Sequence, residues 1–211
     1  MENEKKILIT IGRQSGSAGR RIGFEVGKAL GIPCYDREII SEAAKTHGYA
    51  EEFIERHDEK QASSFLYSIA MGARSPLQQG SVSLPLEQKV FLAQYNTIKE
   101  LANQGSGIFI GRCSDYALEN YEGVTRIFIS CDEDDAVEHV KISYNLSIDK
   151  ARDFIRKKNK KRANYYNYYT GRKWGDAKNY DLCFNKSRLG IEGSVNLILN
   201  YLKCRDEKKD D

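Results

Sequence analysis

The sequence predicts an α/β fold in which five parallel strands form one sheet with helices on both faces. Two observations predict it: short apolar runs alternate with segments of helical periodicity, and a helix-length segment separates each run from the next. Parallel strands need such crossovers, and right-handed crossovers bring the carboxyl ends of the strands to one edge of a doubly wound sheet. We expect the functional residues along that edge.

Two strand and helix units open the chain. Lys6–Ile11 is almost continuously apolar, which predicts a buried strand, and Arg21–Leu30 has the periodicity of a helix that a glycine closes. Pro33–Tyr35 predicts a short second strand. Because Asp36 is a favourable N-cap residue, a helix is predicted from residue 37 to about residue 46.

The next stretch has weak periodicity. Glu51–His57 predicts a short helix, whereas residues 59–85 are rich in Ser, Gln and Gly and predict a mobile insertion. Pro85 starts a long helix whose apolar residues recur along one stripe. The third predicted strand, Ile108–Ile110, ends at Gly111.

The last two strands flank a candidate lid. Arg126–Cys131 predicts the fourth strand, and the acidic residues Asp132–Asp135 suit the positive end of the helix that follows. The region from about 147 to 176 is interpreted as a helical lid, because it lies between the fourth and fifth strands. Asp181–Phe184 predicts the fifth strand and Ile191–Leu202 the closing helix.

We expect a single domain over residues 1–211, because the amino-acid composition does not change abruptly anywhere along the chain. No apolar stretch approaches the roughly 20 residues of a membrane span, and no signal-peptide core follows the first residues, so we expect a cytoplasmic protein without a membrane partner. The five cysteines are widely spaced, which indicates reduced thiols. The net charge of +3 is too small to indicate nucleic-acid binding by itself, and oligomeric state is not specified.

The most informative stretch is the glycine-rich loop within Gly12–Arg21, between the first strand and the first helix. Backbone N–H groups of such a loop converge on one spot and, with the helix dipole, bind phosphate. The usual kinase loop, G-x-x-x-x-G-K-[ST], adds a Lys for the outer phosphates and a hydroxyl for Mg²⁺. Counted from Gly19, Gln14 replaces the first Gly, Arg20 the Lys and Arg21 the hydroxyl residue. A plain turn of small residues is the alternative interpretation.

Two clusters follow the second and third strands. In Tyr35–Glu38 a carboxylate and a guanidinium could face an acceptor, although Asp36 could equally be a plain helix cap. In Gly111–Asp115 the glycine permits close backbone approach, and Arg112 offers a bidentate fork to a phosphate or a nucleobase edge. The alternative for this second cluster is a surface cap.

A third cluster, Ile155–Arg162, is a basic run followed by aromatic residues up to Trp174. On a helix Arg152, Arg156 and Lys160 would line one face, and such charge either stays solvated or closes over an anion. Phosphoryl transfer needs a lid of this kind, to neutralise charge and exclude water. Basic residues interleaved with aromatic ones also suit single-stranded nucleic acid, so an RNA-binding module is a rival function, although we do not expect nucleic acid as the partner.

Together the clusters resemble the cytidylate-kinase-like branch of the nucleoside monophosphate kinases, over nearly the whole chain. The resemblance rests on Arg13-Gln14 leading into Gly16–Arg20, on Tyr35–Ile40, on Ile110–Tyr116, on Arg162 with Tyr165-Tyr166 and Trp174, and on Tyr180–Leu182. It implies a P-loop kinase fold with a helical lid, and transfer of the γ-phosphoryl of ATP, with Mg²⁺, to CMP, dCMP or a related small acceptor. It also implies that residues 59–85 form an insertion on the acceptor side.

The resemblance implies roles for particular residues. Those that would hold the donor phosphates are Arg13, Ser15, Gly16, Ser17, Ala18, Gly19, Arg20 and Arg21. Those that would bind the acceptor are Asp36, Arg37, Arg112 and Asp115. Those that would act in catalysis are Arg20, Arg112, Arg156 and Arg162. Because Arg21 stands where the family has its hydroxyl residue, Ser15 or Ser17 would serve as the Mg²⁺ ligand instead.

The departures from the family pattern fall on catalytic positions. Arg20 keeps the charge of the family's Lys but not its compact ammonium group, and Arg21 cannot bind Mg²⁺. The family's Gly-Arg-Asp acceptor motif ends here in Cys113, and Asp115 is the candidate replacement for the missing carboxylate. Asn159 stands three residues before Arg162, where the broader family carries Asp. A nucleotide-binding relative with impaired catalysis is therefore the main alternative to an active kinase.

Overall fold

The computed structural model describes residues 6–46 and 85–207. Its five strands form one sheet in the order β2-β3-β1-β4-β5, and every pair of neighbours is parallel. The predicted five-stranded parallel sheet is therefore confirmed. The strands are β1 Leu8–Arg13, β2 Cys34–Tyr35, β3 Gly107–Ile110, β4 Val124–Ser130 and β5 Leu182–Asn185.

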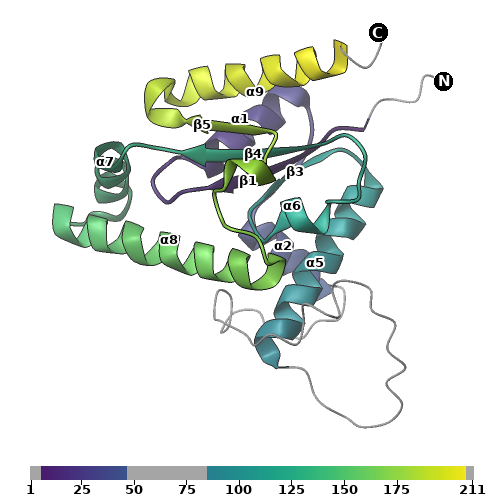
Figure 1. Cartoon of the computed structure of the whole chain (residues 1–211), viewed down its shortest axis with the longest axis horizontal. Helices are drawn as coiled ribbons and strands as arrows, with labels where there is room; N and C mark the ends of the chain where they lie inside the picture. Colours follow the sequence, from purple (N-terminus) through teal and green to yellow (C-terminus); the bar gives the residue numbers. More distant parts are fainter. Residues whose placement is uncertain (1–5, 47–84, 208–211) are drawn as a thin grey trace.

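Helices join the strands and cover both faces of the sheet (Figure 1). The described helices are α1 Gly19–Leu30, α2 Arg37–Thr46, α5 Leu86–Gln104, α6 Ser114–Ala117, α7 Glu133–Tyr144, α8 Ile148–Thr170 and α9 Gly190–Glu207. Two 3-10 turns, η1 Ala177–Asn179 and η2 Lys186–Arg188, flank β5. The helix predicted at 51–57 and the insertion predicted at 59–85 lie outside the described residues, apart from Pro85.

The core is divided by the sheet into two halves. On one face α1 and α9 pack on the sheet through side chains such as Ile22 and Ile198, both fully buried. On the other face α2 and α5 pack through Ile40 and Ile98, also fully buried. In Figure 1, α1 and α9 lie above the sheet, and α2, α5 and α8 lie below it. β1 stands at the centre, so the loop that follows it lies in the middle of the carboxyl edge.

Within the described residues the predicted strands and helices are present, with shifted ends. β1 extends two residues beyond the predicted Ile11, because the strand keeps its pairing with β4 as far as Arg13 and Ile129. α1 begins at Gly19 rather than Arg21, directly after the loop. α6 and the two 3-10 turns were not predicted, because they are only three or four residues long and leave no periodic signal.

α8 combines an exposed first half with a buried second half. Ser147 caps its start, accepting a hydrogen bond from the amide of Lys150. Near its end the ring of Tyr169 stacks on Phe91 of α5, with centroids 3.9 Å apart. The second half of the proposed lid is therefore part of the core. Within the described ranges no helix is both long and apolar enough to cross a membrane.

Candidate active site

The loop after β1, residues 14–18, is fixed at both ends. The amide of Gln14 donates to Ile129 O at 3.0 Å, and its side-chain oxygen accepts from the amide of Cys131 at 3.3 Å. The hydroxyl of Ser17 is fully buried; it donates to Gln14 O at 2.9 Å and accepts from the amide of Gly19 at 3.3 Å. Ser17 therefore braces the loop, whereas Ser15 is the serine of the loop that lines the adjacent cleft.

The backbone of the loop takes the left-handed turns that bring it over the start of α1. Gly16 has φ 86°, and Ala18, the N-cap residue of α1, has φ 56°. A Cβ atom at Gly16 would lie 2.6 Å from Ala136, so α7 packs directly on the loop and only glycine fits there. The first turn of α1, whose amides lack intrahelical partners, lines the cleft beside the loop.

That cleft has a volume of about 570 Å³ and a positive lining. Its cationic side chains outnumber its carboxylates, Asp36 and Glu38. The cationic lining consists of Arg13, Arg20, Arg21, Arg37, Arg112, Lys158 and Arg162. A cleft with this excess of guanidinium groups beside helix amides is suited to a polyphosphate. The structure thus brings most of the predicted donor and acceptor residues to one place.

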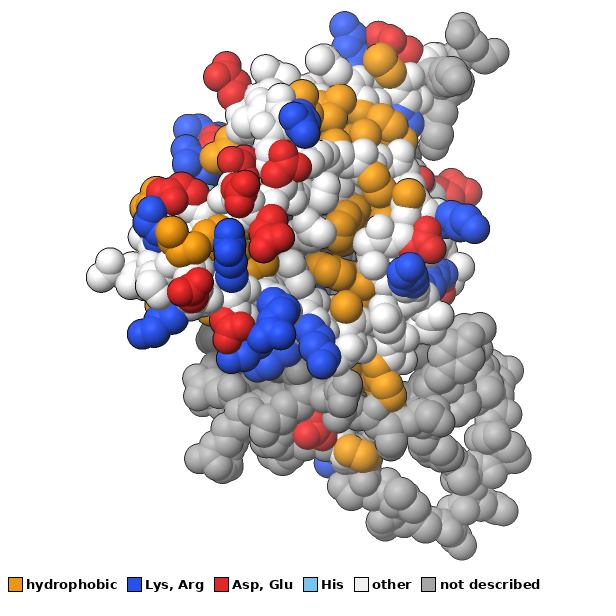
Figure 2. Space-filling model, turned by 60° about the vertical axis from the view of Figure 1, so that its left-hand side comes forward, with side chains coloured by type: hydrophobic (Ala, Val, Ile, Leu, Met, Phe, Trp, Pro, Cys, Tyr) orange, Lys and Arg blue, Asp and Glu red, His pale blue; other side chains and the backbone are white. Residues whose placement is uncertain are grey.

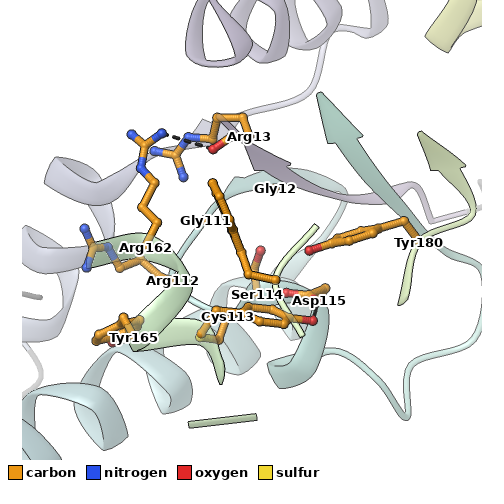
Figure 3. Close-up of a pocket in the computed structure, with 12 residues that line it drawn as sticks. Gly12, Arg13, Gly111, Arg112, Cys113, Ser114, Asp115, Arg162, Tyr165 and Tyr180 are labelled. Atoms are coloured by element: carbon orange, nitrogen blue, oxygen red, sulfur yellow. Dashed lines mark hydrogen bonds between the residues drawn. The ribbon is translucent and has the colours of Figure 1, made fainter. Parts of the chain in front are cut away.

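A second, smaller cavity of about 50 Å³ adjoins the cleft (Figure 3). Arg13, Arg112 and Arg162 line both spaces, so three guanidinium groups stand where the two meet. Asp115 and Tyr180 lie on the other side of the small cavity in Figure 3. The remainder of its lining is formed by Gly12, Gly111, Cys113, Ser114, Tyr165, Tyr166 and Trp174.

The turn after β3 has an unusual backbone that presents Arg112. Gly111, Arg112 and Cys113 are consecutive residues with φ values of 75°, 58° and 53°. Such angles disfavour residues other than glycine, so the turn holds Arg112 in a strained conformation. The guanidinium of Arg112 lies 5.7 Å from the centroid of the Tyr165 ring. A Cβ at Gly111 would overlap the guanidinium of Arg13, so this glycine makes room for it.

Asp115 is a buried carboxyl in the wall of the small cavity. Asp115 is 7% exposed, and its carboxyl accepts a hydrogen bond of 2.6 Å from the hydroxyl of Tyr166. Burial raises the pKa of Asp115 above its ordinary value, although the Tyr166 hydroxyl acts in the opposite direction. The pair joins the short helix α6 to α8 across the cavity.

Asp36 is both a helix cap and the partner of Arg20. One carboxyl oxygen accepts from the amide of Ile39 at 3.2 Å, and the other accepts from Nε of Arg20 at 2.5 Å. Burial opposes the charged form, yet the Ile39 amide and the Arg20 guanidinium hold the pKa of Asp36 below its ordinary value. The two interpretations of Asp36 offered by its sequence, cap and site residue, are thus compatible.

α8 contributes Lys158 and Arg162 to the cleft, and Arg162 donates from Nη1 to the carbonyl oxygen of Arg13 at 3.0 Å. The structure does not bring Arg156 to this place. Its side chain is 75% exposed and pairs with Asp153, and it lines neither space. The face of α7 and α8 in Figure 2 carries Lys and Arg interspersed with Asp and Glu, so much of the basic run is a solvated surface.

Residues outside the predicted site also contact the loop or line the cleft. The carboxamide oxygen of Asn159 accepts from the amide of Ser15 at 2.7 Å, a contact between residues 144 positions apart. The cleft itself is also lined by Phe24, His139 and Tyr144. These three side chains carry no local signal in the sequence, because each reaches the cleft through the packing of its helix.

The aromatic residues after the basic run are core residues. Tyr165, Tyr166 and Tyr169 are 9%, 5% and 4% exposed, and they pack with Phe91 and Tyr116. Stacking on nucleic-acid bases requires exposed ring faces. Tyr165 and Tyr166, on which the RNA-binding alternative depended, are therefore buried, and only Tyr168 and Trp174 of the aromatic run are partly exposed. This burial argues against the RNA-binding alternative.

Comparison with known proteins places this site in context. An uncharacterized protein from Eubacterium ventriosum ATCC 27560 has a crystal structure similar to this one, with a TM-score of 0.72 and 24% identity over 94% of this chain and 99% of that one. Shikimate kinase from Bacteroides thetaiotaomicron is similar with a TM-score of 0.53 and 16% identity, covering 94% and 99% of the two chains. A gluconokinase from Sinorhizobium meliloti 1021 is similar with a TM-score of 0.54 and 12% identity, covering 96% of this chain and 95% of that one.

These likenesses show the α/β fold that the small-molecule kinases share. No curated protein matches the sequence. The sequence model of the cytidylate kinase-like family, in contrast, matches residues 8–188, which include every element from β1 to η2. The chain therefore belongs to the cytidylate kinase-like family.

Proposed function

We propose that this protein is a nucleoside monophosphate kinase that transfers the γ-phosphoryl of ATP to CMP, dCMP or a related small acceptor. One observation carries the proposal. Arg13, Arg112 and Arg162 line both the large cleft and the small cavity, so their guanidinium groups stand between a polyphosphate-sized space and a second binding space. A transferred phosphoryl group would pass between two such spaces at this position.

The donor side of the proposal rests on the loop after β1. Ser15, Gly16, Ala18 and Gly19 border the cleft with the first turn of α1, and Arg21 lines it as well. Backbone amides and the positive end of a helix bind phosphate oxygens without titrating, and guanidinium groups add charge-assisted hydrogen bonds. The donor polyphosphate would lie along this loop, with its outer phosphate toward the three arginines.

The acceptor side rests on the small cavity. Asp115 presents a buried carboxyl there, and Tyr165, Tyr166 and Trp174 supply aromatic walls. A planar ring with an exocyclic amino group suits this lining, because the ring packs on aromatic faces and the amino group donates to the carboxyl oxygen. Cytosine has both features, and its monophosphate would reach the arginines at the mouth of the cavity.

Transfer between these sites needs positioning and electrostatic stabilisation, with no covalent intermediate. An oxygen of the acceptor phosphate forms the bond to the γ-phosphorus as the bond from that phosphorus to the bridging oxygen breaks, and ADP leaves. Arg13, Arg112 and Arg162 would neutralise the charge that spreads over the transferred group. α8 would cover the site and supply Arg162, which lies in its second half.

The residues present fit a Mg²⁺ ion that arrives with the nucleotide. Within residues 6–46 and 85–207 no group of three or more His, Cys, Asp or Glu side chains could hold a metal by itself. Ser15 and Glu38 do line the cleft, and Mg²⁺ is commonly bound by one or two protein oxygens together with substrate phosphates. When bound, the ion would neutralise charge on the β- and γ-phosphate oxygens.

The test is an assay of ADP production with ATP, Mg²⁺ and each nucleoside monophosphate in turn. We expect turnover with CMP or dCMP, and a loss of kcat/KM of about 100-fold in Arg162→Ala, the factor for one charge-assisted contact. Lys161→Ala is the matched control, since Lys161 is an exposed neighbour that lines neither space. Absence of turnover with every acceptor at high enzyme concentration would refute the proposal.

A binder without turnover is the second candidate, and one observation favours it. Arg20, at the position of the kinase lysine, is held by Asp36, and Arg21 provides no hydroxyl for Mg²⁺. Calorimetry distinguishes the two functions. Tight binding of ATP or CMP without phosphoryl transfer would establish the binder, and rapid turnover would exclude it.

A further inference from the structure

A side chain of α8 accepts a hydrogen bond from a backbone amide of the loop after β1. Oδ1 of Asn159 lies 2.7 Å from the amide nitrogen of Ser15, a short and direct hydrogen bond. Three residues further along the helix, Arg162 donates to the carbonyl oxygen of Arg13 at 3.0 Å. Residues at i and i+3 share one face of a helix, so α8 grips the loop through an acceptor and a donor on the same face.

The contact with Ser15 is chemically the same as a contact with phosphate. A carboxamide oxygen and a phosphate oxygen both accept a hydrogen bond from a backbone N–H. Ser15 lines the cleft beside the loop, and its amide belongs to the stretch that the proposed donor phosphates would occupy. A phosphate oxygen and Asn159 cannot both take the single N–H of Ser15 in good geometry.

The helix that carries Asn159 is anchored and cannot readily move away. Tyr166 donates to the buried Asp115 at 2.6 Å, and Tyr169 stacks on Phe91 with centroids 3.9 Å apart. Arg172, just beyond the end of α8, pairs with Glu119 at 2.6 Å. Displacement of the carboxamide by a ligand is therefore a side-chain rotation of Asn159, while the helix remains in place.

We propose that Asn159 is an affinity-determining residue of the donor site: its carboxamide takes the place of a phosphate oxygen at the Ser15 amide, and a polyphosphate must displace it. This inference rests on the proposed function, because it takes the loop after β1 as the site of the donor phosphates. It adds a residue of α8 that competes with the donor for one amide. Because the Asn159 side chain is neutral, it competes only for the hydrogen bond. A carboxylate at this position would compete for the same hydrogen bond and would also repel the phosphates.

The experiment is calorimetric titration with inorganic tripolyphosphate, which carries the phosphates without base or sugar. Asn159→Ala is expected to bind it about fivefold more tightly than the wild type, a factor typical of one neutral hydrogen bond. Asn159→Asp is expected to bind it more weakly than the wild type. Asn164→Ala, which removes an asparagine of α8 that lines neither space, is expected to leave the affinity unchanged.

The outcomes separate this inference from the proposed function. If the wild type binds tripolyphosphate and Asn159→Ala binds it equally or more weakly, the inference about Asn159 is wrong and the donor site stands. If the wild type does not bind tripolyphosphate at millimolar concentration, the donor site itself is refuted, and the inference with it.

A second measurement reads the contact without relying on affinity. The amide resonance of Ser15 in the ligand-free protein should shift upfield in Asn159→Ala and its hydrogen exchange should accelerate, because the hydrogen bond is lost. Tripolyphosphate should reverse both changes. An amide that is indifferent to the substitution would show that the carboxamide is not its partner.

Discussion

Nε of Arg20 donates to Oδ2 of Asp36 across 2.5 Å, and this contact ties the first turn of α1 to the N-cap of α2. The arginine side chain is 64% exposed, while the aspartate is 1% exposed. The ion pair therefore links α1, which follows the loop after β1, to α2, which follows β2. Asp36 thus has two partners, the Arg20 guanidinium and the Ile39 amide, and different substitutions at Asp36 remove one or both contacts.

Asp36→Ala should lower the free energy of unfolding by about 1 to 2 kcal/mol at neutral pH, chiefly through loss of the helix cap. Asp36→Asn should lower it less, because Asn is an equally good N-cap residue that lacks the charge for Arg20. Urea denaturation of both variants measures the difference. Equal losses would mean that the helix cap contributes nothing measurable beyond the ion pair with Arg20.

The pH dependence of Asp36 has a definite sign. Its pKa is lower in the folded protein than the value of about 3.9 for an unfolded chain, so its charge contributes stability above that pH. The contribution is lost as the pH falls through the folded pKa. The difference in unfolding free energy between wild type and Asp36→Asn should accordingly shrink below about pH 4. A difference that grows on acidification would contradict this assignment.

Asp115 should behave in the opposite way, because burial raises its pKa in the folded protein. The fold then disfavours the ionised carboxyl, and stability falls as the pH rises from about 3.9 through the folded pKa. Asp115→Asn does not ionise and keeps an oxygen for the Tyr166 hydroxyl. Its unfolding free energy relative to wild type should rise with pH over that window, as urea titrations at several pH values would measure.

Arg112→Gly should separate activity from stability. Glycine relieves the left-handed strain at φ 58°, worth about 1 to 2 kcal/mol, and loses about 0.5 to 1 kcal/mol through its freedom in the unfolded chain. Stability should thus stay within about 1 kcal/mol of wild type, while kcat/KM falls about 100-fold or more. The control is Asn145→Gly, at φ 50° at the end of α7, which should keep full activity.

Gly111→Ala and Gly123→Ala form a matched pair. Both glycines have positive φ, 75° and 71°, so each substitution adds a strain of about 1 kcal/mol. A Cβ at Gly123 meets nothing within 4 Å, whereas one at Gly111 overlaps the guanidinium of Arg13. Only Gly111→Ala should therefore lower kcat/KM, by displacing Arg13. Parallel losses of activity in both variants would remove Arg13 from the proposed mechanism.

Much of the fold could be predicted because its signals are local. The helix predicted from 37 to about 46 matches α2, since Asp36 caps it and supplies a start that the sequence alone reveals. The apolar run before the glycine-rich loop likewise marked β1. The end of β1 lay two residues further on because pairing with β4 determines it, and that pairing involves residues more than 100 positions away.

The site was predicted less completely, because burial decides which side chains reach it. Helical periodicity groups Arg156 with Arg152 and Lys160, but packing turns Arg156 to solvent and Arg162 to the loop. Ser17 resembles a metal ligand in sequence, yet its hydroxyl bonds within the loop. The aromatic run looked like an exposed surface because its partner on α5, Phe91, is distant in the chain.

The three guanidinium groups at the junction of the two spaces come from three different elements that meet at the carboxyl edge of the sheet. Arg13 ends the central strand, Arg112 follows β3, and Arg162 is carried by a helix anchored on α5. β1 and β3 are paired, and Arg162 donates to the backbone of Arg13, so loosening one of these contacts would change the spacing of the three groups. Activity should therefore depend on how these three elements are placed relative to one another. It should be lost under mild denaturant before the sheet itself unfolds.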